Sequence, residues 1–474
     1  MSLPFDLSKA QCQRARMSRD ARFDGKFYVA VKTTGIYCRP ICPATAPKES
    51  NVSYYASAFE AANQGYRPCL RCRPDSAPGS YAWKGVDTTV ERALKLIDQG
   101  ALIDGSVEDL AERLGISSRH LRGLFQDKLG IAPKGYAVYQ QLLFAKQLLH
   151  QTDLSVTDVA YSSGFQSVRR FNDSFKQHFQ LTPKQLRKRD KAPGECLDLW
   201  ISYRPPYRWD LMQQFLSKRL IEGLEWCGEN SYGRTFVWQA SDGEDPVEGY
   251  FTATHNAEKN GFEVKLYMPT GKAILPVMRN IRRILDVDTD ISLIEGQLKQ
   301  VAEIGPHIIE GLRLPGIWDA FEAGIRAVLG QQISVEAARK LVLVLVTSYG
   351  KKIEIDGELR YLFPTPEQLQ DVDFMALKMP HTRRVTLQSL SRFCTQPQFD
   401  YDLDLWLSIK GIGPWTVNYA KMRGQSDSDV WLGSDLGVIK ALRQLNDESA
   451  NSQFNPDDAG PWRSYLTFQC WNLL

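Results

Sequence analysis

The chain lacks the features that mark membrane, secreted or disordered proteins. Its longest apolar run, residues 341–346, is far shorter than the ~20 residues that a membrane helix needs. Residues 1–24 contain no apolar segment typical of a secretory signal, and the nine cysteines form an odd, unevenly spaced set. With 43% hydrophobic and 24% charged residues, the composition is that of a folded protein. We therefore expect a cytoplasmic protein without a disulfide framework.

A strong overall charge is also lacking, because the net charge is only +3. The two parts of the chain nevertheless differ. Residues 1–191 contain 29 Lys and Arg against 18 Asp and Glu, whereas residues 192–474 contain 29 against 37. The basic first part favours a polyanionic partner, and any DNA contact in the acidic second part must be local.

The length of 474 residues and two turn-rich or charged stretches, at 74–80 and 188–194, predict a multidomain protein. The fold class that we expect is mainly α with α/β parts. The expected domains are a small four-cysteine zinc domain (1–80), an all-α double helix-turn-helix domain (81–191), an antiparallel β/α subdomain (196–283) and an all-α helix-hairpin-helix domain (284–474).

Four of the cysteines are spaced as two short pairs. Three residues separate Cys38 from Cys42, two separate Cys69 from Cys72, and 26 lie between the pairs. Each pair can place two thiolates on one turn, and two pairs complete the tetrahedron that Zn²⁺ prefers. We therefore predict one zinc ion here, against the alternative of four unrelated buried cysteines. Arginines that would suit a phosphate backbone crowd the ligands: Arg39, Arg67, Arg71 and Arg73.

The surrounding segments, DGKFYVAVKTTGIYCRP at 24–40 and YRPCLRCRPD at 66–75, resemble the N-terminal domain of the Ada adaptive-response regulator. In that family a four-cysteine zinc site repairs DNA methylphosphotriesters, so the resemblance implies that Cys38 accepts the methyl group. A zinc-bound thiolate is deprotonated yet nucleophilic, which suits this chemistry. The competing hypothesis is a zinc domain that serves only as a structural clamp.

Two further segments have the apolar spacing of short helix pairs joined by a glycine turn. In the first, Gly115 ends one helix and Ser117 can cap the next, and Gly164 marks the same turn 49 residues later. Two units are stronger support than one, and they resemble the AraC-type DNA-binding domain, which the Ada regulator also carries. Their second helices would expose residues that read bases or phosphates: Ser118, Arg119, Arg122, Gln166, Ser167, Arg169, Arg170 and Asn172.

Near the C-terminus, a Gly-x-Gly hairpin is followed by a single aspartate. Gly411 and Gly413 separate two predicted helices and would let the backbone approach a phosphate. Asp435 lies 22 residues past Gly413, at the end of the segment VWLGSD. Upstream, the segment at 319–334 contains Gln331 and Gln332.

These motifs resemble the helix-hairpin-helix DNA glycosylases, and residues 197–474 resemble 3-methyladenine DNA glycosylase II. The resemblance implies an antiparallel β subdomain, which agrees with the alternating residues on either side of the Asn260-Gly261 hairpin signal. It implies that Asp435 is the catalytic aspartate, stabilising an oxocarbenium-like sugar or activating water. It places four aromatic residues around a flipped cationic base, which they would hold by stacking and cation–π attraction: Phe215, Trp415, Tyr419 and Trp471.

Two positions depart from relatives of this kind. A well-known member has leucine at the position that fills the gap left by the flipped base, and this chain has Gln332 there, so the wedge function stays open. Relatives that also cleave the strand carry a Schiff-base lysine after the hairpin, where this chain has Trp415. We therefore predict a monofunctional glycosylase. DNA-binding roles are expected for Gly411, Gly413 and Gln331, and the hairpin allows a monovalent cation.

Together the resemblances imply a methylation-sensing transcription activator joined to a glycosylase for alkylated purines. The expected partners are double-stranded DNA, alkylated DNA, promoter DNA and RNA polymerase, with no membrane. The methyltransferase domain of the longer Ada regulator is not matched, so we expect no repair of O6-methylguanine. The alternative is a pure transcription regulator with a degenerate glycosylase portion, which Asp435 and the intact hairpin speak against.

Overall fold

The structure, a computed structural model, divides the chain into two compact units. Unit 1 is Met1–Glu195 with Thr270–Arg279, and unit 2 is Cys196–Pro269 with Asn280–Leu474. The residues described are 7–20, 23–24, 26–42, 44–56, 60–61, 64–69, 72, 88–98, 100–103, 105–187, 196–239, 245–269, 273–396, 403–446 and 454–473. None of the helices in these ranges is both long and apolar enough to span a bilayer. The predicted linker at 74–80 lies outside the described residues.

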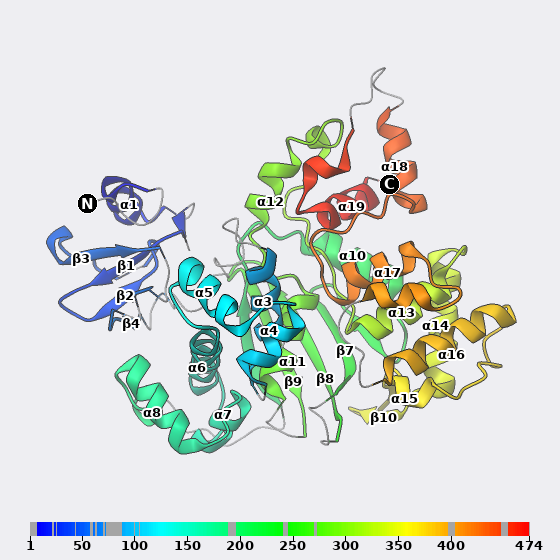
Figure 1. The fold of residues 1–474 in the computed structure, drawn as a ribbon, viewed down its shortest axis with the longest axis horizontal. Helices are drawn as coiled ribbons and strands as arrows, with labels where there is room; N and C mark the ends of the chain where they lie inside the picture. Colours follow the sequence, from blue (N-terminus) through cyan, green and yellow to red (C-terminus); the bar gives the residue numbers. More distant parts are fainter. Residues whose placement is uncertain are drawn as a thin grey trace. The chain divides into compact units, whose positions relative to one another are not determined.

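Unit 1 begins with a four-stranded sheet in the order β3-β1-β2-β4 (Figure 1). The strands β1 and β2 pair antiparallel, as do β1 and β3, whereas β2 and β4 run parallel. The helix α1 precedes the sheet, and its Arg16 donates to Tyr54 Oη and to Glu49. The bounds are α1 Lys9–Met17, β1 Tyr28–Val31, β2 Ile36–Cys38, a 3₁₀ turn Glu49–Asn51, β3 Val52–Tyr55 and β4 Arg67–Pro68.

The rest of unit 1 is helical and contains the predicted repeat. Ser117 caps one second helix by accepting from His120 N, and Ser167 caps the other by accepting from Arg170 N. Gly115 and Gly164 have φ of +69° and +84° at the turns before these helices, as predicted. The helices are α3 Thr88–Asp98, α4 Val107–Arg113, α5 Ser118–Leu129, α6 Pro133–Gln151, α7 Val156–Ser162, α8 Val168–Phe179 and α9 Pro183–Leu186.

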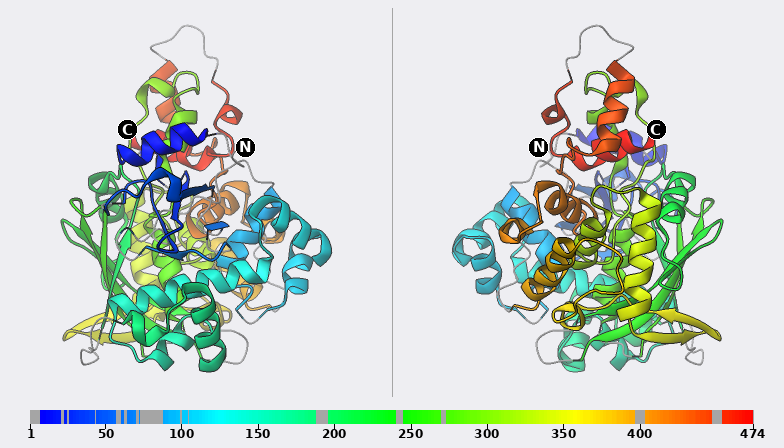
Figure 2. Two further views of the ribbon diagram at one scale, coloured as in Figure 1. Left: turned by 90° about the vertical axis from the view of Figure 1, so that its left-hand side faces the viewer. Right: turned by 90° about the vertical axis from the view of Figure 1, so that its right-hand side faces the viewer.

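Unit 2 begins with a five-stranded antiparallel sheet in the order β5-β9-β8-β7-β6, drawn in green in Figure 2. The predicted turn is present between β8 and β9, with Asn260 at φ +50° and Gly261 paired with Asn256. Between β5 and β6 the chain forms the helix α10. The bounds are β5 Leu197–Ser202, α10 Trp209–Arg219, β6 Glu225–Cys227, β7 Ser231–Trp238, β8 Val247–Asn256 and β9 Gly261–Tyr267.

From residue 274 onward helices dominate, but the all-α expectation for 284–474 is wrong in one place. A short hairpin, β10 (Lys352–Ile355) with β11 (Glu358–Tyr361), turns at Asp356 and Gly357, both at positive φ. Alternating residues around Asp-Gly form a standard hairpin signal, which the sequence analysis missed. The helices are α11 Ile274–Ile284, α12 Ile291–Leu298, α13 Ala320–Gly330, α14 Val335–Tyr349, α15 Pro366–Leu369, α16 His381–Cys394, α17 Pro414–Gly424, α18 Leu436–Asn446 and α19 Arg463–Asn472, with 3₁₀ turns Gly305–His307, Leu403–Ser408 and Pro456–Ala459.

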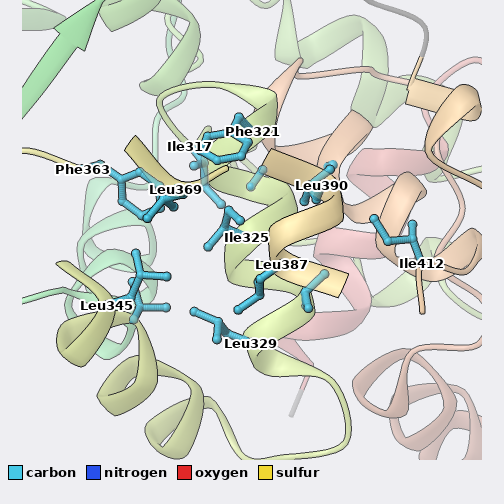
Figure 3. Close-up of a cluster of buried hydrophobic side chains, with 14 of the residues drawn as sticks. Ile317, Phe321, Ile325, Leu329, Leu345, Phe363, Leu369, Leu387, Leu390 and Ile412 are labelled. Carbon is cyan, nitrogen blue, oxygen red and sulfur yellow. The ribbon is translucent and has the colours of Figure 1, made fainter. Parts of the chain in front are cut away.

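The core of the helical part of unit 2 fixes the position of the Gly-x-Gly hairpin. Phe321, Ile325 and Leu329 on α13 pack with Leu387 and Leu390 on α16 (Figure 3). Ile412, the residue between the two hairpin glycines, is 6% exposed and belongs to the same cluster. Burial of this one side chain anchors the turn, while the backbone on either side stays at the surface.

Candidate functional site

The four cysteines of unit 1 come together because β2 and β4 run parallel. Tyr37 is in register with Pro68, so the strands deliver Cys38 and Cys69 to the same end of the sheet. Cys69 N donates to Tyr37 O at 2.9 Å, which fixes this alignment. The sulfurs of Cys38, Cys42, Cys69 and Cys72 all lie within 4.8 Å of one another.

This cluster has the chemistry of a zinc site. The pKa of Cys38 is raised, first by hydrogen bonds with the other three thiols and then by burial. The pKa of Cys42 is lowered to about 7, chiefly because Cys42 shares a hydrogen bond with Cys38. Four thiols this close cannot all ionise without a nearby cation to balance their charges. Four sulfur ligands this close together match the preference of Zn²⁺, so the residues fit the metal.

Arg39 is tied to the cluster rather than directed away from it. Its backbone N–H donates to Cys72 Sγ at 3.3 Å, and its Nη1 donates to Cys72 O at 3.3 Å. Its Nε donates to Asp24 Oδ1 at 2.8 Å, and Nη2 donates to the other carboxylate oxygen. Arg67 lies half-buried in β4. Arg71 and Arg73 lie outside the described residues.

The residues predicted to read DNA lie at the surface of α5 and α8 or just before α8. Arg119, Gln166, Arg169 and Arg170 are exposed. Arg122 is also exposed, and it forms an ion pair with Glu108 at 2.7 Å. That pair is open to solvent, so a phosphate can replace the carboxylate at little free-energy cost.

The two hairpin glycines differ in what surrounds them. Gly411 has φ +95°, and a Cβ there would lie 2.2 Å from Thr386 Oγ1, so the fold itself requires glycine. Gly413 has no atom within 4 Å of an added Cβ and stands directly before α17, which has no side-chain cap. The open N-terminus of α17 is therefore available to an external anion. Gln331 Nε2 donates to Gly411 O and Thr416 Oγ1, each at 3.1 Å, and Gln332 is exposed at φ +59°.

Asp435 stands directly before α18 and is held by donors from three helices. Trp415 Nε1 donates to Oδ2 at 3.1 Å, and Trp471 Nε1 donates to Oδ1 at 2.9 Å. The backbone N–H groups of Gly437 and Val438 add contacts to Oδ1 at 2.9 and 3.4 Å. All four partners are donors, as an ionised carboxylate requires. The side chain is half-buried, so one edge of this anion faces solvent.

The four aromatic candidates form two layers beside Asp435. Trp415 and Tyr419, one turn apart on α17, stack with centroids 5.3 Å apart and are half-buried. Trp471 is also half-buried and stacks on Phe215, with centroids 6.1 Å apart at 13°. Phe215 itself is only 6% exposed. The structure therefore places Phe215 behind the surface that the other three rings form.

Two arginines beside the Phe215 ring escaped the sequence analysis. Arg219 Cζ lies 3.7 Å from the centroid of the Phe215 ring, and Arg423 Cζ lies 4.7 Å from it. Arg219 follows Phe215 by one turn of α10, so the i,i+4 spacing on a helix could have identified it. Arg423 is on α17, and only the tertiary structure brings it to Phe215.

Three family models match the chain, and together they cover most of it. The metal binding domain of Ada matches residues 11–75, a helix-turn-helix domain matches residues 110–189, and the AlkA N-terminal domain matches residues 197–319. The four-cysteine cluster and the five-stranded sheet fall within the first and last of these segments, and the helix-turn-helix match begins inside α4 and covers the rest of the repeated helix pairs.

Curated relatives resemble either the whole chain or one part of it. A Mycobacterium tuberculosis protein, the probable bifunctional transcriptional activator/DNA repair enzyme AlkA, is 33% identical over 98% of this chain and 96% of its own length. DNA-3-methyladenine glycosylase 2 of Escherichia coli is 29% identical over 57% of this chain and 95% of its own. The bifunctional transcriptional activator/DNA repair enzyme Ada of Escherichia coli is 34% identical over 38% of this chain and 49% of its own.

Proposed function

Because the chain belongs to the family of bifunctional transcriptional activators and DNA repair enzymes named AlkA, we propose that it responds to DNA alkylation with two separate chemistries. The cysteine cluster takes a methyl group from a DNA phosphotriester onto Cys38. The pocket at Asp435 hydrolyses the N-glycosidic bond of alkylated purines such as 3-methyladenine. The observation that best supports the glycosylase activity is the Asp435 carboxylate, which accepts hydrogen bonds from two indole N–H groups beside stacked aromatic rings.

In the base-release reaction, a flipped alkylated purine would stack on Trp415, Tyr419 and Trp471. The bond between the sugar C1′ and the base nitrogen breaks, and the electron pair leaves with the base. Positive charge then develops on the sugar, where the carboxylate of Asp435 stabilises it or takes a proton from the attacking water. The indole donors keep the carboxylate in place and leave one edge of it open to the sugar.

The hairpin is proposed to hold the DNA strand. Gly413 and the open N-terminus of α17 would bind a phosphate, and a monovalent cation held by the hairpin backbone would add positive charge there. Gln331 positions the turn through Gly411 O and Thr416 Oγ1. Gln332, exposed beside it, is the candidate to fill the gap that the flipped base leaves.

The glycosylase is proposed to be monofunctional. Trp415, at the position where strand-cleaving relatives carry lysine, donates its Nε1–H to Asp435 and has no amine to form an imine. Borohydride reduction during turnover should therefore trap no protein–DNA adduct. An efficient trap would contradict this assignment.

At the cysteine cluster, the sulfur of Cys38 would attack a methyl carbon of a phosphotriester. The methyl–oxygen bond breaks, the sulfur becomes a thioether, and the phosphate leaves as an ordinary diester. A bound zinc ion supplies the charge that keeps the sulfurs deprotonated. The ion pair between Arg39 and Asp24, together with the contacts of Arg39 to Cys72, holds the ligand loop in shape. No further chemistry is required of the protein.

Methylation of Cys38 would act as a signal through charge. Four thiolates with one Zn²⁺ carry two negative charges, and conversion of one to a thioether removes one of them. At an effective dielectric near 40, this weakens repulsion of each nearby phosphate by about 1 kcal/mol. Two or three phosphates then raise operator affinity about ten- to a hundredfold. The helix pairs of unit 1 would bind the promoter and present the chain to RNA polymerase in the cytoplasm.

The proposal is tested with the full chain and duplex DNA that is methylated on both base nitrogens and phosphate oxygens. Chromatography of the supernatant should show free 3-methyladenine, and mass spectrometry should show one methyl group on the peptide that carries Cys38. A chain that binds DNA but releases no base would support the pure regulator instead. A chain that releases base but never methylates Cys38 would leave the zinc domain as a clamp.

A further inference from the structure

Arg219 is a cation at the lesion pocket that the proposed mechanism does not use. It lies at the end of α10, half-buried, with its guanidinium carbon 3.7 Å from the centroid of the Phe215 ring. Arg219 Nη1 donates a long hydrogen bond of 3.4 Å to Phe215 O. Among the described residues, Arg219 forms no ion pair with a carboxylate. A guanidinium has five N–H donors, so most of its donors remain for another acceptor.

A second arginine strengthens the positive potential at the same ring. Arg423 is 3% exposed, and its guanidinium carbon is 4.7 Å from the Phe215 centroid. Its donors are engaged with Pro315 O at 2.6 Å and with Tyr419 Oη at 3.5 Å. Burial lowers the pKa of both arginines, to about 10 for Arg219, and the charges of Tyr419 and Asp435 partly offset this effect at Arg219. Arg219 therefore stays charged at neutral pH.

Two stacked aromatic rings connect Arg219 with the Asp435 carboxylate. Phe215 stacks on Trp471, and Trp471 donates to Asp435. Arg219 covers Phe215 at one end of this series, and the Asp435 anion closes the other end. A base that enters beside these rings, with its sugar at Asp435, would lie between a positive and a negative group.

We propose that Arg219 stabilises the electron pair that the departing base takes with it, and so determines which bases the pocket can release. The inference rests on the proposed glycosylase function. When the bond between C1′ and the base nitrogen breaks, the pair moves toward Arg219 and positive charge moves to the sugar beside Asp435. Water then adds to C1′ and its proton passes to Asp435 or to solvent. Both ends of the pocket favour this displacement of charge.

The effect depends on the charge of the leaving base. A cationic base such as 7-methylguanine leaves as a neutral molecule, so it gains little from a nearby guanidinium. A neutral base such as hypoxanthine leaves as an anion and presents acceptor atoms, so a charge-assisted hydrogen bond stabilises its departure. Arg219 thus extends the substrate class from cationic alkylated purines to neutral bases with an acceptor at the edge that faces it.

The test compares single-turnover release of 7-methylguanine and hypoxanthine from otherwise identical duplexes. Arg219→Met should slow hypoxanthine release about 100-fold and 7-methylguanine release less than tenfold. The control is Lys218→Met, which removes an exposed charge one residue away. It should change both rates by the same factor or not at all.

Arg219→Lys gives a readout that a purely structural role would not produce. A lysine in this half-buried position titrates below its usual range. Release of hypoxanthine by this variant should fall as pH rises from 7 to about 8.5, while the wild type stays level because Arg219, with a pKa of about 10, remains charged over this range.

The outcomes separate the two proposals. If Arg219→Met slows both bases equally, slows neither, or if the wild type releases 7-methylguanine but no hypoxanthine, the role of Arg219 is overturned and the glycosylase function stands. If the wild type releases neither base, the glycosylase function fails, and the role of Arg219 fails with it.

Discussion

The cysteine cluster and the Asp435 pocket stabilise negative charge in opposite ways. In the cluster, four sulfurs within 4.8 Å bring their charges together, and only a cation can hold them. In the pocket, a single carboxylate is surrounded by neutral donors, two indole N–H groups and two backbone N–H groups. The first arrangement suits a nucleophile that is spent once. The second suits an anion that returns unchanged after each reaction.

The comparison also concerns what each site demands of the fold. Cys38 ends β2 and Cys69 directly follows β4, so the cysteines gather at one end of a small sheet, and a bound metal would contribute much of the stability of that domain. The Asp435 donors come from α17, α18 and α19, and the described residues of unit 2 contain no group of three or more side chains placed to hold a metal ion. Damage to the two sites should therefore have different consequences for folding.

The largest effect is expected from loss of a metal ligand. Cys42→Ser should release the zinc and unfold the zinc-bound part of residues 7–72, because a structural zinc site contributes on the order of 10 kcal/mol of folding free energy. Metal analysis and limited proteolysis measure this. Cys12→Ala, in the same domain but outside the cluster, should keep the metal. Normal stability of Cys42→Ser, or of the wild type after chelation, would contradict the account.

The next effect concerns the indole donors. Trp471→Phe removes the hydrogen bond to Asp435 Oδ1 while keeping an aromatic ring, so the rate of base release should fall about 10- to 100-fold with little loss of stability. Trp431→Phe is the matched control, since Trp431 packs on Phe454 and donates nothing to Asp435 in the described structure. Equal rates for the two variants would show that the carboxylate does not depend on its donors.

The two hairpin glycines should separate stability from DNA binding. Gly411→Ala forces an L-residue to φ +95° and into Thr386, so unfolding free energy should fall by about 1–3 kcal/mol. Gly413→Ala meets no atom of the protein, so its unfolding curve should be unchanged while affinity for DNA falls about tenfold. Denaturant unfolding and fluorescence anisotropy measure the two quantities. The reverse assignment of effects would refute this reading of the hairpin.

The smallest effect is a pH dependence in the sheet of unit 2. Burial lowers the pKa of His255, and Tyr203 Oη lies 2.8 Å from its Nε2, as suits a neutral ring that accepts a hydrogen bond. The imidazole of His255 binds a proton more readily in the unfolded state than in the folded state. The contribution of neutral His255 to the free energy of unfolding is therefore present above pH ~6.5 and is lost as pH falls below it. His255→Phe should flatten the dependence of urea midpoints between pH 7.5 and 5.5. Parallel curves for variant and wild type would exclude this role.

The cysteine cluster and the Asp435 pocket also differ in how far the sequence predicts them. The ligands Cys38, Cys42, Cys69 and Cys72 are identified by spacing, because short loops keep paired ligands together in any fold. Gly115, Gly164 and the cap at Ser117 are equally local, and the structure confirms these three, whereas the matching cap at Ser167 was not predicted.

Contacts between segments that are distant in the chain were harder to predict from the sequence. Phe215 lies one layer behind the other three rings, and Arg219 covers it, because α10 packs against residues more than 200 positions later. The β10–β11 hairpin was missed although its Asp356-Gly357 turn is a local signal. The fold class therefore follows from local patterns, whereas the charge balance of the pocket follows from tertiary packing.

The most direct test of two chemistries in one chain counts both products in one reaction. The wild type and Asp435→Asn are each incubated with excess methylated DNA, and the moles of free 3-methyladenine and of methyl on Cys38 are measured per mole of protein. Asp371→Asn, an aspartate with an 80% exposed side chain, is the control. The account predicts many bases per wild-type chain, none from Asp435→Asn, and at most one methyl on Cys38 in all three proteins. Undiminished base release by Asp435→Asn would contradict it.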